Sequence, residues 1–569
     1  MRTPAVLACA AALASAAYIA PDIESLRPAG SRDLREAIEW YSADRDALEK
    51  YYPVRYSLGR ARAFEQFESA WLGALAKVRF DTLDVHGKAD AVAWRSHAES
   101  ARHDAVRERE RIEEMHAQIP FGEAVADLFM ARQRVERVDP EKAAGELARI
   151  GKVVQDLSAR AAKGKASKTA AYRAARATNS LRETLKDWYG FYAGYDPLFT
   201  WWVKDPYTKL DQSLEAYATL LREKLAGIKK GDTDSIIGDP AGRAALLAQL
   251  SAEMIPYTPE ELIAIAEREF DWCDREMLRA SRDLGYGEDW KKALEHVKTL
   301  HVEPGKQPEL VRDQVREAIA YVTSNGMITV PPQASAAWRM EMMSPERQRV
   351  NPFFTGGPLL SVSFPTDGMT HEERQMSLRG NNIHFSRATV FHEVIPGHYL
   401  QMFMNRRYRP YRDAFWTPFW MEGWALYWEM ILWDRGFPET PENRIGALFW
   451  RMHRCARIVF SLKFHLGEMT PEQAIDYLVN RVGHERENAA AEVRRSVAGV
   501  DRPLYQCAYM LGALQFRALR KELVDSGRMT EREFHDKILR IGMLPVELVR
   551  ASLGIGTLTP EYSSRWRFY

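Results

Sequence analysis

The sequence predicts a mainly α-helical fold with a small β-sheet in its C-terminal half. Apolar residues recur every three or four positions from about Ser31 to Val322, which is the period of an amphipathic helix. Near Asn325 the composition shifts to short stretches rich in glycine, proline and β-branched residues. Helical spacing resumes at about Ser386 and continues to the C-terminus. We therefore expect one mostly helical body with two lobes facing a cleft.

Length and composition restrict the class of protein. A chain of 569 residues can bury a large core without disulfides or metals to hold it together. Its 79 basic and 78 acidic residues give a net charge of +1, which argues against nucleic acid as a partner. Four cysteines without a CxxC pair argue against a disulfide scaffold or a zinc knuckle. The unusual feature is the presence of 16 tryptophans, many of them in one short segment.

The first twenty residues have the form of an export signal. Met1–Ala20 carries one arginine ahead of a small-residue apolar run, and Ala14-Ser15-Ala16 suits a signal peptidase. A buried N-terminal helix and a retained membrane anchor are the alternatives, although the run is short for a bilayer. We expect residues 1–20 to be removed and the mature protein to be periplasmic or secreted, without a membrane span. Its remaining three cysteines are expected to be free, buried thiols.

The region from residue 21 to 325 is expected to be helical. Thr258-Pro259-Glu260-Glu261 and Thr470-Pro471-Glu472-Gln473 each combine a capping residue, proline and an acid, as at a helix start. Glycines predict helix ends at Gly151, Gly164, Gly227 and Gly285. Six early segments fit an amphipathic helix better than a strand: Asp33–Tyr51, Ala61–Arg79, His97–Ala117, Pro140–Ala162, Lys168–Trp188 and Leu214–Leu225.

Two or three short strands with loops are expected after residue 325. Gly326–Pro332, Asn351–Gly357 and Pro358–Pro365 place glycine and proline between β-branched and aromatic residues. Within the last segment, Leu359–Phe364 could pair with an extended peptide or be a plain edge strand.

The candidate chemistry begins in Phe391–Gln401, which reads FHEVIPGHYLQ. Zinc hydrolases need two neutral imidazoles and a third ligand on the metal, plus a carboxylate that takes a proton from water. On a regular helix this requirement produces HExxH, because residues four apart share a face. Here His398 follows His392 by six positions, which would point it to a different face of a regular helix.

Pro396 and Gly397 lie inside that interval of six residues. Proline removes an amide hydrogen and clashes with the preceding turn, and glycine adopts backbone angles that other residues avoid. We infer that the helix breaks or bulges here, which brings His398 back toward His392. The alternative is a capped helix end with partly buried histidines, since the chain contains two further His-Glu pairs.

A second motif, Trp420–Glu429 (WMEGWALYWE), supplies two acids. Glu422 and Glu429 are seven residues apart and share one face of a helix. The tryptophan-rich surroundings make these acids costly to bury unless something pairs with them. A divalent cation with its imidazoles would do so, with Glu422 as third ligand and Glu429 orienting a ligand histidine. A membrane helix, or a core helix whose acids pair with Arg454 or Arg457, is the alternative.

The two motifs together resemble HExxPGHxxQ and EGWAxYxE of the bacterial family called domain of unknown function 885. That family resembles the helical zinc metallopeptidases of the thimet oligopeptidase and angiotensin-converting enzyme type. The similarity extends to Ile255–Leu262, Thr329–Pro332 and Thr470–Leu478, and it covers most of the chain from about residue 30. The resemblance implies a large helical metallopeptidase-like body, with residues 326–569 as the catalytic region and in one structural unit with the preceding helices.

The resemblance also implies one Zn²⁺ ion bound by His392, His398 and Glu422, with Glu393 as the general base. The sequence departs from the family pattern elsewhere, with Ser461 in place of an aspartate among other changes. These departures concern the substrate side rather than the metal.

Further candidates surround these ligands. Glu429, Gln401 and Arg457 are assigned to the shell around the metal. A tetrahedral oxyanion needs a donor besides the metal, and Tyr509, His465 and Arg457 are the candidates for it.

We therefore predict a zinc-dependent hydrolase, a peptidase that acts on a peptide or small amide substrate. One alternative is a zinc hydrolase of a non-peptide amide or ester. The others are a non-catalytic helical binding protein that retains the fold, and a purely structural helical protein.

Overall fold

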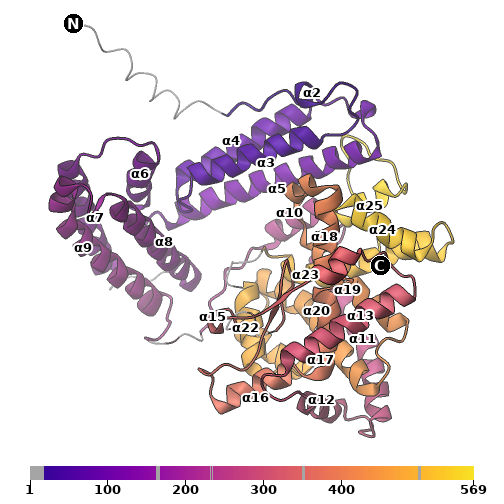
Figure 1. Ribbon diagram of the computed structural model, residues 1–569. Coiled ribbons are helices and arrows are strands. Elements are labelled where there is room, and N and C mark those ends of the chain that lie inside the picture. The colour runs from indigo at the N-terminus through magenta and orange to yellow at the C-terminus, as the bar shows by residue number, and fades with distance from the viewer. Residues whose placement is uncertain are drawn as a thin grey trace. The chain divides into compact units, whose positions relative to one another are not determined.

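The computed structural model describes residues 18–161, 167–230, 232, 235–348, 351, 353–497 and 502–569. This part of the chain is mainly α-helical, as predicted (Figure 1). Most of the predicted export signal, Met1–Ala20, lies outside the described residues. Among the described helices, none combines the length and apolar character that a bilayer crossing requires.

The chain divides into two compact units. The first contains Met1–Thr82 and Trp94–Ile237, and the second contains Leu83–Ala93 and Gly238–Tyr569. The long helix α5 (Val85–Met115) therefore begins in the second unit and continues in the first. Residue 325, near which the composition of the sequence changes, lies inside the second unit.

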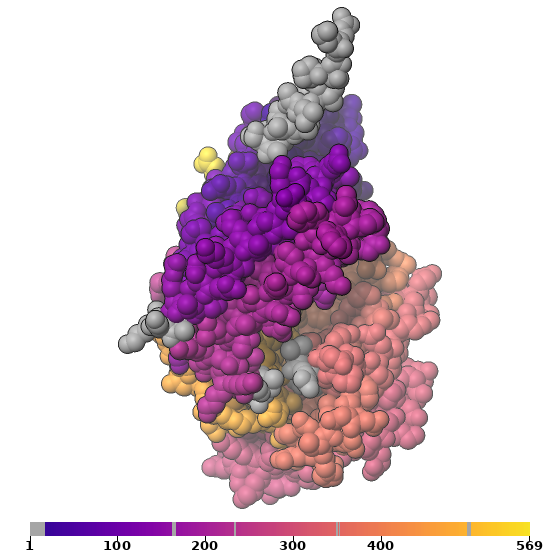
Figure 2. Space-filling view, turned by 90° about the vertical axis from the view of Figure 1, so that its left-hand side faces the viewer, coloured from indigo at the N-terminus to yellow at the C-terminus, as the bar shows by residue number. Residues whose placement is uncertain are grey.

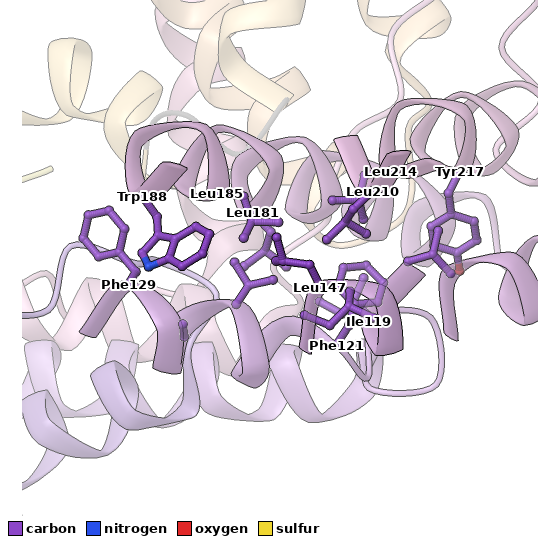
Figure 3. Packing of buried hydrophobic residues seen from close by; sticks show 14 of the residues in the cluster. Ile119, Phe121, Phe129, Leu147, Leu181, Leu185, Trp188, Leu210, Leu214 and Tyr217 are labelled. Carbon is purple, nitrogen blue, oxygen red and sulfur yellow. The ribbon is translucent and has the colours of Figure 1, made fainter. Parts of the chain in front are cut away.

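The first unit is built around an apolar core of buried side chains that several of its helices contribute (Figure 3). Helix α7 contributes Leu147, Ile150 and Val154, which recur at three- and four-residue spacing and are buried. Leu181 and Trp188 of α8 belong to the same core. Side chains of this unit, coloured indigo to magenta, are visible on the face drawn in Figure 2. Besides α5 and α7 (Pro140–Ala161), its helices are α2 (Ile23–Leu26), α3 (Arg35–Tyr51), α4 (Leu58–Leu75), η1 (Phe80–Thr82), α6 (Gly122–Gln133), α8 (Lys168–Tyr192), α9 (Pro197–Leu220) and η2 (Leu221–Leu225).

The second unit carries both chemical motifs. Helices α17 (Ile383–Glu393), α18 (His398–Tyr408), α19 (Pro418–Asp434), α20 (Pro441–His465), α22 (Arg486–Val497) and α23 (Tyr505–Arg520) supply the candidate site. The remaining helices are α10 (Arg243–Ala252), α11 (Pro259–Asp283), α12 (Trp290–Thr299), α13 (Gln307–Ser324), α14 (Pro332–Ala337), α15 (Pro345–Gln348), α16 (His371–Gly380), η3 (Pro410–Phe415), α21 (Pro471–Tyr477), η4 (Leu478–Val482), η5 (Lys521–Asp525), α24 (Glu531–Ile541) and α25 (Val546–Ser552).

The sheet is smaller than expected and lies partly elsewhere. Strands β1 (Met340–Met342) and β2 (Leu360–Val362) pair in parallel, with Met340 opposite Leu360. Gly326–Pro332 forms no strand, and β1 lies where no strand was predicted. An antiparallel bridge from Thr355 covers the other side of β2 at Ser361. Both edges of β2 are therefore occupied at Ser361, which leaves no free edge for an extended peptide at that residue.

Most helix starts and ends that were predicted from capping residues and glycines are confirmed. Thr258 and Thr470 each form a full capping box at the predicted starts of α11 and α21. Gly227 and Gly285 follow helix ends with φ near +80°, as predicted. Gly151 lies inside α7, so the predicted helix end there is wrong, and Gly164 falls outside the described residues. The three described cysteines are buried and unbonded, as expected.

Candidate functional site

The helix that carries His392 ends at the predicted break. Helix α17 stops one residue after His392, and Val394 leaves the helix with φ −110° and ψ −92°. The Ile395-Pro396 peptide bond is cis, and α18 starts at His398 directly after Gly397. As a result the rings of the two histidines meet edge to face, with their centroids 4.9 Å apart.

Contacts from the tryptophan-rich helix α19 hold this broken segment. The indole N–H of Trp424 donates to the carbonyl oxygen of Pro396 at 2.9 Å. The amide of Gln401 donates to the carbonyl oxygen of Trp420 at 2.9 Å. A Cβ at Gly397 would overlap a backbone carbonyl oxygen of α17, so this position requires glycine. Gln401 thus supports the main chain of α19 beside the two histidines.

Four buried side chains converge beside the break. Nε2 of His398 lies 3.1 Å from Oε2 of Glu422, and Nε2 of His392 lies 3.6 Å from the same oxygen. Ligand atoms of His392, Glu393 and His398 all lie within 4.8 Å of one another. The structure therefore brings together the three residues predicted as metal ligands and the residue predicted as the base.

The spacing of these donors fits a small divalent cation. Two ligands that share a tetrahedral zinc at about 2.0–2.2 Å lie roughly 3.3–3.6 Å apart. The imidazole nitrogen of His392 lies 3.6 Å from the Glu422 oxygen, inside that range, and that of His398 lies 3.1 Å from it, about 0.2 Å below the range. Two imidazoles and a carboxylate are also a donor set of catalytic zinc sites. The residues present therefore fit Zn²⁺ in both chemistry and spacing.

Glu429 contacts the other nitrogen of His392. Its Oε1 lies 2.7 Å from Nδ1 of His392 and 3.5 Å from Nη2 of Arg454. A carboxylate at Nδ1 fixes the tautomer of the imidazole and leaves Nε2 to face the cluster. The alternative of an ion-paired core helix thus applies in part to Glu429, which does lie near an arginine. Glu422 instead faces the two imidazoles and Tyr505.

The carboxylates and imidazoles shift each other's pKa values. Burial alone would raise the pKa of Glu422, but His398 and His392 lower it well below its usual value. Burial alone would lower the pKa of His392, but its contacts with Glu422 and Glu429 raise it to about 9. Without a cation the cluster therefore holds a proton at neutral pH, and a metal has to displace that proton.

Glu393 is a buried carboxylate to which no described residue donates a hydrogen bond. Burial raises its pKa, although His392 and His398 offset part of the effect. The backbone of Gly356 lies against it, since a Cβ there would overlap the Glu393 carboxylate. A carboxylate with a raised pKa and no hydrogen-bond donor is suited to accept and return a proton.

Two tyrosines of α23 form one wall of the cluster. The hydroxyl of Tyr505 donates to Oε1 of Glu422 at 2.5 Å. The ring of Tyr509 lies nearly parallel to that of His392, with centroids 6.2 Å apart. Burial raises the pKa of both tyrosines, so their hydroxyls stay protonated and can act as donors.

Two glycines allow α23 to approach α19 this closely. A Cβ at Gly512 would overlap the backbone of Phe419 and Gly423, and a Cβ at Gly423 would overlap the backbone of Gly512. Tyr509 lies one turn before Gly512 on α23. The glycine contact therefore sets the distance between the tyrosines and the metal-ligand candidate on α19.

The other two predicted residues lie on α20. Arg457 donates from Nε to Oε1 of Glu492 at 2.6 Å, and its guanidinium lies 4.3 Å from the ring centre of Tyr509. His465 is the last residue of α20, where its Nδ1 accepts a hydrogen bond from the backbone N–H of Ala241 at 3.2 Å. It lies about 12 Å along the helix axis from Arg457. Arg457 therefore borders the cluster through Tyr509, whereas His465 supports the chain leading into α10.

Sequence reasoning missed Tyr505 and Gly356 as residues of the site. Tyr505 and Tyr509 are four apart on one helix, and this spacing was a usable signal for a shared face. Gly356 carries no such signal, because its contact with Glu393 depends on how a loop packs against the end of α17.

A family described as "Bacterial protein of unknown function (DUF885)" matches residues 46–553. No curated protein matches the chain.

Two solved structures share the fold at low sequence identity. One is a candidate lipoprotein of unknown function from Shewanella oneidensis, which is 17% identical with a TM-score of 0.69. The match covers 90% of this chain and 98% of that one. The other is a candidate lipoprotein from Colwellia psychrerythraea, 16% identical with a TM-score of 0.55, covering 87% of this chain and 91% of that one.

Proposed function

This chain belongs to the bacterial family of unknown function DUF885, and we propose that it is a zinc-dependent hydrolase that acts as a peptidase. One observation carries the proposal. The Nε2 atoms of His392 and His398 converge on one oxygen of Glu422, and the Glu393 carboxylate lies beside them without a hydrogen-bond donor. A purely structural core has no evident use for either arrangement, because each one buries charged groups close together.

The residues of the chain divide the work of hydrolysis as follows. Zinc held by His392, His398 and Glu422 would act as a Lewis acid, and it would lower the pKa of a water molecule to near neutrality. Glu393 takes the proton of the attacking water and returns it to the leaving amine. Glu429 keeps His392 in the tautomer that presents Nε2 to the cluster.

The tyrosine wall supplies donors for the charge that develops on the substrate carbonyl. Tyr509 lies against the His392 ring, and its hydroxyl accepts a hydrogen bond from Arg495 at 3.3 Å. That contact leaves the hydroxyl proton of Tyr509 to donate elsewhere. Preorganised donors of this kind stabilise an oxyanion more than a ground-state carbonyl.

Export supports the peptidase form of the proposal. Both solved relatives are described as candidate lipoproteins, and Met1–Ala20 has the form of a signal sequence. We propose that the mature protein acts outside the cytoplasm, where short peptides and other amides are available as substrates.

Metal content of the purified, zinc-supplied protein tests the proposal. We expect about one zinc per chain, lost in His398→Ala and Glu422→Ala because each removes a ligand. Glu393→Gln should keep the zinc and lower turnover of peptide substrates by at least about 100-fold, because it removes only the proton acceptor.

His371→Ala is the matched control, since His371 also precedes a glutamate but is exposed at the start of α16. It should retain both zinc and turnover. A folded, zinc-supplied protein without bound metal would refute the proposal. Bound metal without hydrolysis of any peptide, amide or ester would favour the non-catalytic binding protein.

A further inference from the structure

We propose that a surface cavity formed by α13 and α14 binds a small organic molecule that carries a phosphate group. The cavity belongs to the second unit and has a volume of about 550 Å³. Its walls come from one face of α13 and from the residues that end α14 and lead into β1. Small-molecule pockets typically measure about 300–1,000 Å³, so a ligand of this class fits. Such binding would be independent of the hydrolase proposed above.

Three arginines line the cavity from two segments of the chain. Arg312 and Arg316 are four residues apart on α13, so they share one face of the helix. Arg339 follows α14 and donates from Nη1 to the carbonyl oxygens of Ala336 and Trp338, at 3.1 and 2.8 Å. A guanidinium has five N–H donors, so these two bonds hold the group in place and leave three donors for a ligand.

The acids near these arginines match only part of their charge. Asp313 pairs with Arg312 at 2.8 Å and lies 3.8 Å from Arg316. Among the described residues, no acid lines the cavity or forms an ion pair with Arg339. Three guanidinium groups and one shared carboxylate leave a surplus of two positive charges at this surface. An anion would therefore find a favourable potential in the cavity.

The ion pairs of Asp313 compete only weakly with such a ligand. The side chains of Arg316 and Asp313 are 70% and 60% exposed, so water and salt screen their attraction. A phosphate that contacts two guanidinium groups at once gains several charge-assisted hydrogen bonds in a fixed geometry. The exposed carboxylate can thus be exchanged for a phosphate without leaving a buried charge unpaired.

The charge surplus favours a phosphate monoester over a carboxylate. A phosphate monoester carries about −1.5 to −2 charges at pH 7, which matches the surplus, whereas a carboxylate carries one charge. Thr323, Ser324 and Ser335 add three hydroxyl groups to the same cavity. A hydroxyl can donate to those phosphate oxygens that the arginines do not contact.

Apolar groups form the rest of the wall. Ile319 and Ala320 line the cavity between Arg316 and Thr323 along α13. Trp338 lines it from the other segment and is partly exposed. An indole packs well against a flat aromatic ring. The ligand class is therefore a phosphate monoester of an aromatic or other apolar alcohol, and not inorganic phosphate alone.

Isothermal titration calorimetry of the full chain with three probes tests the site. Phenyl phosphate carries both the dianion and the apolar body, inorganic phosphate lacks the body, and benzoate lacks the second charge. We expect saturable binding of phenyl phosphate, at least about tenfold tighter than that of either other probe. Equal affinity for benzoate would overturn the assignment to phosphate, and equal affinity for inorganic phosphate would overturn the apolar body.

Variants of the cavity assign the binding to its residues. The double variant Arg316→Gln/Arg339→Gln should weaken binding of phenyl phosphate at least about tenfold, because it removes two of the three cations. Trp338→Ala should reduce the affinity for phenyl phosphate toward that for inorganic phosphate. Asp313→Asn should instead tighten binding, because it removes the carboxylate that competes for the arginines.

Two controls separate this cavity from other sites for an anion. Arg279→Gln removes an exposed arginine of α11 that pairs with Glu276 three residues away, and it should bind phenyl phosphate like wild type. A phosphate can also bind a metal, so His398→Ala and wild type treated with EDTA should both retain the affinity. Loss of binding in these two samples, no saturable binding by wild type, or unchanged affinity in the double arginine variant would each overturn the cavity site.

Discussion

Buried histidines of the second unit differ in their neighbours, as His392 and His535 show. Those of the candidate metal cluster face carboxylates, and the pKa of His392 is raised to about 9. His535 lies instead between neutral groups, donating from Nδ1 to the carbonyl of Met327 and accepting from the hydroxyl of Tyr427, both at 2.8 Å. Burial lowers the pKa of His535 to about 4. The surroundings therefore separate histidines prepared for a cation from histidines that have to stay neutral.

Acid should destabilise the protein through His535, whose pKa is lowered by burial. His535 has a folded-state pKa below its ordinary value of about 6.5, so its contribution to stability is complete above pH 6.5 and is lost as the pH falls toward 4. Between pH 7 and 5.5 this histidine should lower the free energy of unfolding by about 1 kcal/mol. Urea unfolding of wild type and His535→Gln at both pH values measures the effect. A variant with unchanged pH dependence would contradict it.

For single residues, the sequence was most informative where two chemical requirements coincided. His392, Glu393, His398 and Glu422 could be found because ligand chemistry limits the residue types and a helix limits their spacing. His465 was named as a donor candidate without any spacing that ties it to the metal ligands, and the helix places it at the end of α20 against Ala241. A residue type without a spacing constraint predicts little about position.

Pairs of helices set the geometry of the site. The break between α17 and α18 turns one histidine toward the other. The glycine contact between α19 and α23 brings the two tyrosines against Glu422 and His392. Each of these arrangements needs a position without a side chain, at Gly397 and at Gly512.

Replacing Gly512 by alanine should disrupt the α19–α23 pair. The added methyl group would overlap the backbone of Phe419, and overpacking of this kind typically costs about 1–3 kcal/mol. Tyr509 would move with the helix, so zinc affinity and turnover should fall as well. Gly145→Ala in α7 is the control: it meets open space and should gain about 0.5–1 kcal/mol from helix propensity. Chemical denaturation of both variants checks this, and equal stability of Gly512→Ala and wild type would contradict the close approach.

Helices were easier to predict than strands for a physical reason. Thr258 and Thr470 specify helix starts through hydrogen bonds to residues three positions away, so the short capping motif can be recognised in the sequence. The strand Met340–Met342 depends on a partner twenty positions away, Leu360–Val362, and its three residues, Met-Glu-Met, are too short a run for their alternation to indicate a strand. The helix end predicted at Gly151 was wrong because a glycine inside a helix is tolerated where it meets open space.

At the scale of the whole molecule, α5 takes part in both units. Asp90, in its first turns, receives Arg412 Nε at 2.7 Å and the hydroxyl of Tyr411 at 2.8 Å. Both members of the ion pair are fully buried. Arg412 also donates to the carbonyl of Ile541. A short piece of a helix that continues in the first unit thus completes the polar interior of the second.

Removing Asp90 should unfold the second unit more readily. Asp90→Ala leaves the Arg412 guanidinium buried without its carboxylate, and breaking such a pair costs about 3–5 kcal/mol. The double variant Asp90→Leu/Arg412→Met should recover most of that loss because it removes both charges. Hydrogen exchange of α18 and α24 measures the effect, with Arg102→Ala, an exposed change on the same helix, as the control. Similar exchange in Asp90→Ala and wild type would show that the pair contributes little.

The shared helix also imposes an order of events during synthesis. Asp90 and Arg412 are separated by 322 residues. At roughly 5–20 residues per second, about 15 to 65 seconds pass between their translation. During that interval the first turns of α5 exist without the residues that bury them, while the rest of the helix already has its own core to fold with. A chain built this way leaves the Asp90 carboxylate without its arginine, and the first turns of α5 incompletely packed, until the second half of the chain has been made.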